Sequence, residues 1–141
     1  TFKYFNAVHS SALPDGSNGG NPGGFVIWDG GQCFYFAGDT GYFSGFEAIG
    51  RRLGPFDLVA LPIGAYEPRA MMRESHMNPE EALLAAMDLQ ASRALAIHFG
   101  TFDLSDEPLA EPPLRFRDAA RNSELGEEAA WVFDIGETRE F

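Results

Sequence analysis

Four residues far apart in the chain have side chains that suit a metal centre: His9, Asp39, His76 and His98. The three histidines are all that the sequence contains. Imidazole nitrogens and carboxylate oxygens are common zinc ligands. Singly, each residue also has an ordinary explanation, because an aspartate often caps a turn and a lone histidine is usually satisfied by backbone groups. The chemistry therefore depends on whether the fold brings the four together.

The local sequence predicts that these residues lie where strands or helices end. Asp39 follows the apolar run 34–37, and His98 follows the run 94–97. Short apolar runs bounded by glycine are typical of buried strands, and polar residues at strand exits form the sites of α/β sheets. His9 precedes the Ser/Gly-rich loop 10–24, and His76 lies two residues before a predicted helix N-cap at Asn78.

The elements that must position these residues follow from apolar periodicity and from turn signals. Together they predict an α/β fold with a mixed sheet. We expect a β-hairpin over 25–37 that turns at Asp29-Gly30, a helix from Ser44 to Leu53, a strand over 58–63, a helix that begins at Asn78, a strand over 94–97, a helix over about 114–121 and a last strand over 130–135.

Composition narrows the classes of partner. A net charge of −11 argues against binding nucleic acid, which needs Lys and Arg to neutralise phosphates. No apolar stretch approaches the length of about 18 residues that a membrane span requires. The single Cys33 excludes an internal disulfide and suits a buried position. We expect one soluble domain with no transmembrane segment, located in the cytoplasm or peripherally at membranes.

Several segments, taken in order, resemble the metallo-β-lactamase superfamily. Within it, the match is to the zinc phosphodiesterases related to N-acyl-phosphatidylethanolamine phospholipase D. The resemblance covers roughly residues 7–115. It lies in the segments Phe36–Tyr42 (FAGDTGY), Gly54–Leu58 (GPFDL), Leu61–Arg69 (LPIGAYEPR), His76–Ala82 (HMNPEEA), Ala96–Phe102 (AIHFGTF), Asp106–Pro108 (DEP) and Glu111–Pro113 (EPP).

The resemblance implies an αββα sandwich that holds two zinc ions at one edge. It implies that His9 binds the first zinc, that Asp39 bridges both ions, and that His98 is a terminal ligand of the second. His76 matches a catalytic histidine near the substrate phosphate and outside the metal shell. The implied substrate is a glycerophospholipid with an N-acylated ethanolamine head, which is cleaved to phosphatidic acid and the N-acylethanolamine.

One superfamily signature, His-x-His-x-Asp-His, is not in this sequence. We therefore expect residues 1–141 to be the C-terminal half of one hydrolase domain, with the other ligands supplied upstream of Thr1 or by a complementary chain. Two alternatives stay open. One is a lactonase of the same superfamily that acts on a phosphorylated sugar lactone. The other is an inactive half-domain that pairs with a partner or dimerises through an unpaired sheet edge.

Overall fold

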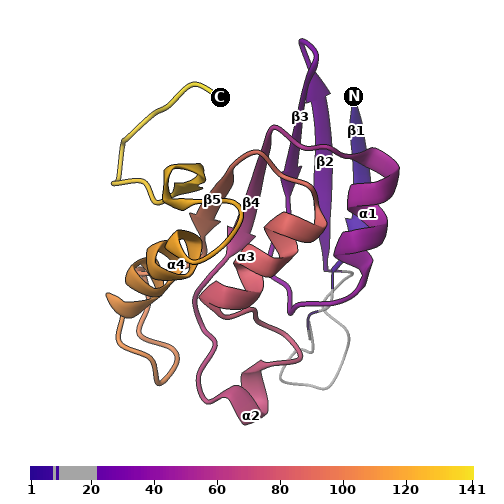
Figure 1. Ribbon diagram of the computed structural model, residues 1–141. Coiled ribbons are helices and arrows are strands. Elements are labelled where there is room, and N and C mark those ends of the chain that lie inside the picture. Colours follow the sequence, from indigo (N-terminus) through magenta and orange to yellow (C-terminus); the bar gives the residue numbers. More distant parts are fainter. Residues whose placement is uncertain (8, 10–21) are drawn as a thin grey trace.

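A computed structural model describes residues 1–7, 9 and 22–141 (Figure 1). Most of the predicted loop 10–24 lies outside these residues, but its last two positions, Gly23 and Gly24, belong to a strand and not to a loop. In the described part, one sheet contains six strands in the order of the sequence. The strands are β1 (Phe2–Asn6), β2 (Gly23–Asp29), β3 (Gln32–Phe36), β4 (Leu58–Pro62), β5 (Ala94–Ile97) and β6 (Ala130–Trp131).

The sheet is mixed, as the sequence predicted. β1, β2 and β3 pair antiparallel, and β3, β4, β5 and β6 pair parallel. Two successive reversals give β1 the same direction as β3, so the carboxyl ends of β1, β3, β4 and β5 lie at one edge. Ligand sites of α/β sheets form at this edge.

The predicted hairpin is confirmed, but its two turn residues are Gly30 and Gly31 rather than Asp29 and Gly30. Asp29 and Gln32 face each other across the turn between β2 and β3. The two residues between them, Gly30 and Gly31, have φ angles of 57° and 91°. Positive φ at both central residues matches the twist of the flanking strands, and glycine adopts it without steric cost.

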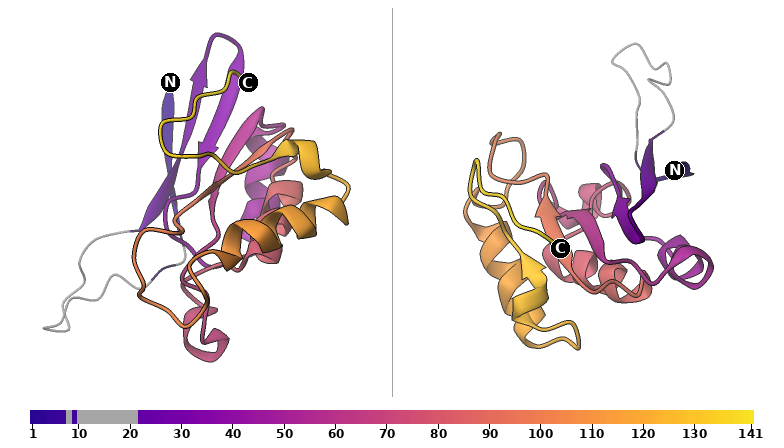
Figure 2. Two further views of the ribbon diagram at one scale, coloured as in Figure 1. Left: turned by 90° about the vertical axis from the view of Figure 1, so that its left-hand side faces the viewer. Right: turned by 90° about the horizontal axis from the view of Figure 1, so that it is seen from above.

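The helices cover one face of the sheet (Figure 2). The helix that begins after Asn78 is capped as predicted: the Asn78 side chain accepts from the Glu81 amide, and the Glu81 carboxylate accepts from the Asn78 amide. The helices are α1 (Gly45–Leu53), α2 (Arg69–Met72), α3 (Pro79–Asp88) and α4 (Glu111–Arg121), followed by a short 3-10 turn, η1 (Glu127–Ala129).

Two predicted boundaries near the C-terminus were also wrong. Helix α4 begins at Glu111 rather than about Leu114, because the first turn of a helix tolerates the prolines that follow Glu111. The last strand ends at Trp131 rather than residue 135. It pairs only with the first half of β5, and Phe133 stacks on the Trp131 ring instead of extending the ladder.

The core lies between the sheet and the helices. Tyr35 and Leu61 from the sheet meet Phe46 and Phe116 from α1 and α4, all of them buried. Cys33 is also buried, as predicted. No helix in the described ranges has the length and apolar character needed to cross a bilayer.

The other face of the sheet carries large apolar side chains that remain exposed. Phe25 and Phe36 oppose each other on β2 and β3, and 44% and 38% of their surfaces are accessible. Tyr4 packs edge-on against Phe25 from β1. The C-terminal Phe141 reaches this sheet near Phe34. We call the face that Tyr4, Phe25, Phe34 and Phe36 form the open face.

Candidate metal centre

Asp39 occupies a tightly built loop at the end of β3. Gly38 has φ 69°, and a Cβ atom there would lie 2.7 Å from the Gly23 carbonyl oxygen, so only glycine fits. Thr40 is fully buried, and its carbonyl oxygen accepts from the Met77 amide at 3.2 Å. This bond joins the Asp39 loop to the segment that carries His76.

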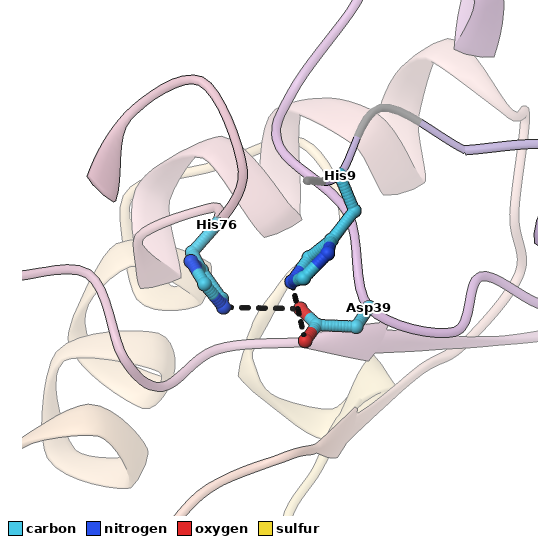
Figure 3. A group of neighbouring side chains, drawn as sticks. All are labelled: His9, Asp39 and His76. Carbon is cyan, nitrogen blue, oxygen red and sulfur yellow. Dashed lines mark ion pairs between the residues drawn. The ribbon is translucent and has the colours of Figure 1, made fainter. Parts of the chain in front are cut away.

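All three histidines converge on the Asp39 carboxylate. Nε2 of His9 lies 2.9 Å from Oδ2 and Nε2 of His98 lies 3.3 Å from the same oxygen, whereas Nε2 of His76 lies 3.4 Å from Oδ1. Figure 3 shows His9 and His76 pointing at Asp39 from separate segments of the chain. The structure thus brings together all four residues that the sequence singled out.

His76 lies deeper in this cluster than the resemblance implied. One donor atom each from His9, Asp39 and His76 forms a set whose members lie within 4.8 Å of one another. The His76 ring is 4.9 Å from the His9 ring and 5.8 Å from the His98 ring, measured between centroids. His76 is therefore within reach of a cation as well as of a substrate beside it.

The electrostatics of the site hold the carboxylate ionised. Burial alone would raise the pKa of Asp39, but the imidazoles of His76 and His98 close to its two oxygens outweigh burial and hold the pKa well below its usual range. In turn, the hydrogen bond to Asp39 raises the pKa of His98 despite partial burial. A divalent cation requires the ionised carboxylate, and it binds each imidazole in its neutral form, so metal binding would release any proton that His98 holds.

The donor set fits a bound metal. Among the described residues, Asp39 Oδ1 and His76 Nδ1 are buried without a hydrogen-bond partner. A buried polar atom without a partner is costly, so such atoms commonly mark a missing ion, water or ligand. Three imidazoles and one carboxylate are ligands that zinc accepts. The resemblance implies that His9, Asp39 and His98 would hold the metal; by distance, His76 lies as close to the carboxylate as His98 does.

His98 is held in an unusual backbone conformation. Its φ is 58°, a left-handed value that is uncommon outside glycine. The neighbouring strand end packs closely on it, because a Cβ atom at Gly64 would lie 2.3 Å from the His98 carbonyl oxygen. Backbone strain of this kind persists where the surrounding structure imposes it, often at functional sites.

Two supporting contacts had no predicted role. Arg69 donates to the His76 carbonyl oxygen at 2.9 Å and pairs with Glu81. The buried Glu107 accepts from the backbone amides of Ala65 and Glu67. The segments around these residues belong to the resemblance, but sequence spacing did not show that they contact each other across the fold.

Comparison with known proteins agrees with this geometry. The Beta-lactamase superfamily domain matches residues 1–99. The metallo hydrolase Igni18 from Ignicoccus hospitalis superimposes with a TM-score of 0.72 at 30% identity, over 99% of this chain and 53% of that one. The chain therefore belongs to the metallo-β-lactamase superfamily of metal-dependent hydrolases.

Two curated relatives refine this placement. A metal-dependent hydrolase from Deinococcus radiodurans is 41% identical over 134 residues, which are 95% of this chain and 52% of that protein. An N-acyl-phosphatidylethanolamine-hydrolyzing phospholipase D from Caenorhabditis elegans is 38% identical over 117 residues, or 81% of this chain and 33% of that protein. The chain thus spans about half or less of the length of these relatives.

Proposed function

We propose that the protein containing this chain is a zinc-dependent phosphodiesterase of the N-acyl-phosphatidylethanolamine phospholipase D type. The convergence of three imidazoles on the Asp39 carboxylate carries the proposal. The choice of a phosphodiester rests on the Caenorhabditis elegans relative, whose name states that activity. The products would be phosphatidic acid and an N-acylethanolamine.

Each site residue has a proposed role. His9 and His98 bind metal through Nε2, the atom that each directs at Asp39. Asp39 is suited to serve two ions because its two oxygens face different histidines. When bound, a zinc pair lowers the pKa of a coordinated water to near neutrality and offsets negative charge on the phosphate.

His76 acts on the substrate in this proposal. Its Nε2 points into the cluster, and its side chain is only 14% exposed. From there it donates the Nε2 proton to the alkoxide oxygen that leaves phosphorus, so that the leaving group departs as a neutral alcohol. General acid catalysis of this kind typically contributes about 10²–10⁴-fold in rate.

A second layer of the domain is proposed to pack on the open face. Phe25 and Phe36 lie directly opposite each other, and both rings are accessible. Exposed apolar patches of this kind mark interaction surfaces. The chain spans about half or less of the length of its curated relatives, which supports an occupant drawn from the rest of the domain or from a complementary chain. That layer would bring the remaining metal ligands.

The test is His76→Ala in the complete protein, assayed on an N-acylated phosphatidylethanolamine. Turnover is expected to fall about 100-fold or more while zinc content stays unchanged. The exposed Arg73 lies in the same segment, and Arg73→Ala is the matched control. Loss of zinc together with activity would make His76 a metal ligand and overturn its proposed role.

The substrate class is tested separately with the wild-type protein. Hydrolysis of bis(p-nitrophenyl) phosphate and of the N-acylated phospholipid supports the proposal. Hydrolysis of a phosphorylated sugar lactone alone would instead assign the site to a lactonase and refute the phosphodiesterase.

A further inference from the structure

A cavity of about 280 Å³ lies beside His98, on the side of the segment that follows β5. Its inner wall is formed by Gly64 and Ala65, which follow β4. We call this cavity the His98 pocket. Its apolar lining consists of Phe99, Phe102, Leu104, Leu109 and Pro112.

Two polar side chains in the wall of the His98 pocket, Glu107 and Ser105, already form hydrogen bonds within the protein. The Glu107 carboxylate accepts from the backbone amides of Ala65, Tyr66 and Glu67 at 2.6, 3.4 and 2.9 Å. The Ser105 hydroxyl donates to the same carboxylate at 2.8 Å. These bonds tie the two walls together, so the pocket is preformed and offers little polarity to a ligand.

The rim of the pocket leaves large apolar side chains in solvent. Phe102 and Leu104 are 73% and 79% exposed, and Leu109 is 44% exposed. Covering such side chains is favourable in proportion to the apolar area removed from water. The apolar lining of the pocket therefore favours a hydrocarbon group as its ligand.

We propose that the His98 pocket binds a hydrocarbon chain of the ester that is hydrolysed at the metal centre. His98 belongs to both sites, since its Nε2 faces Asp39 and the residue is part of the pocket lining. This continuity identifies the occupant as a substituent of the substrate. The volume lies just below the usual range for small-molecule sites, so the pocket accommodates one segment of a hydrocarbon chain rather than a whole phospholipid. The inference rests on the proposed function.

Binding is measured first, by calorimetry on the complete, metal-loaded protein with methylphosphonate and octylphosphonate. Both compounds present the same anionic head, and only octylphosphonate carries a chain. Octylphosphonate is expected to bind at least about tenfold more tightly, which corresponds to the burial of roughly two methylene groups. Equal affinity for the two phosphonates would overturn the proposal.

Variants of the pocket then show where the octyl group binds. Phe102→Ala and Leu104→Ala are expected to abolish most of the octyl preference and to leave methylphosphonate binding unchanged. Leu114→Ala is the matched control, because Leu114 is 59% exposed on α4 and does not line the pocket. A loss of affinity for both phosphonates in the Phe102 and Leu104 variants would show that the rim packs against protein and not against substrate, which overturns the assignment.

Turnover measurements test the pocket assignment and the phosphodiesterase proposal separately. On the p-nitrophenyl esters of methyl and octyl phosphate, kcat/KM should favour the octyl ester in the wild type and lose that preference in the two pocket variants. If neither ester is hydrolysed, the phosphodiesterase proposal fails while the phosphonate preference still reports on the pocket. If both are hydrolysed equally, the pocket assignment fails and the phosphodiesterase stands.

Discussion

Arg69 links the segment that carries His76 to the first turn of helix α3. Its Nη1 donates to the His76 carbonyl oxygen at 2.9 Å, and its Nη2 lies 2.8 Å from both oxygens of the Glu81 carboxylate. Glu81 also accepts from the Asn78 amide in the capping box. One guanidinium therefore fixes both the backbone of a site residue and the start of a helix.

Arg69→Met should destabilise the protein by about 2 kcal/mol, because it leaves the Glu81 carboxylate and the His76 carbonyl without their donor. Both side chains of the pair are only about a quarter exposed, so solvent screens the interaction weakly. Urea unfolding provides the measurement. Arg51→Met is the control, since the Arg51–Glu47 pair is largely exposed and such pairs contribute roughly 0–1 kcal/mol. Equal losses in the two variants would contradict the bridging role of Arg69.

Asp39→Asn should weaken metal binding by about 100-fold or more. Removing a residue that only hydrogen-bonds to a metal ligand already lowers metal affinity by about 10–100-fold, and loss of a ligand's charge should cost at least as much. The amide keeps the shape of the carboxylate but removes the negative charge that faces three imidazoles. Chelator competition followed by elemental analysis measures the affinity. Asp29→Asn, in the exposed hairpin turn, should leave metal content unchanged. Full metal occupancy in the Asp39 variant would refute the metal centre.

Glu107 should make stability depend on acidity. Burial alone would raise the pKa of Glu107, but hydrogen bonds from the Glu67 amide and the Ser105 hydroxyl outweigh burial and lower it. A carboxyl group whose pKa is lower in the folded state stabilises the fold above its unfolded pKa, and this contribution is lost as pH falls through the folded value.

The corresponding experiment compares the free energy of unfolding of the wild type and Glu107→Gln. At pH 7 the variant should be less stable by about 1–3 kcal/mol, the cost of weakening a buried, charged hydrogen-bond acceptor. The difference should shrink as the pH falls below about 4.5. Glu124→Gln, at an exposed position, is the control. A difference that does not change between pH 7 and pH 3.5 would show that ionisation of Glu107 has no role.

The open face should make the 141-residue chain self-associate when it is expressed alone. Phe25→Lys combined with Phe36→Lys should restore a monomer, because it places charge on adjacent strands of that face. Sedimentation velocity at increasing concentration measures the association. Leu84→Lys is the control on helix α3, where the leucine is 41% exposed. We also expect the chain alone to be inactive. A wild-type chain that stays monomeric and hydrolyses phosphodiesters would contradict the proposed second layer.

Local patterns in the sequence were sufficient to predict many of the helices and strands. The hairpin over residues 25–37 follows from two apolar runs around Asp29-Gly30, and the start of α3 follows from Asn78, Pro79 and Glu81. Turn and cap preferences act over a few residues, so they can be read directly. The end of β6 was less predictable because strand pairing decides it, and the start of α4 was less predictable because a first helical turn tolerates proline.

The same distinction holds for the site. Residue type and position at strand exits indicated His9, Asp39, His76 and His98 as candidates for a metal centre. Only the tertiary structure decided that His76 lies within 4.8 Å of His9 and Asp39, that Arg69 holds its backbone, and that Glu107 closes the wall of an apolar pocket beside His98. These contacts join residues up to 67 positions apart along the chain, which is the separation of His9 and His76 (76 − 9). Such contacts depend on which strands are neighbours and on the directions in which they run, and local sequence does not carry that information.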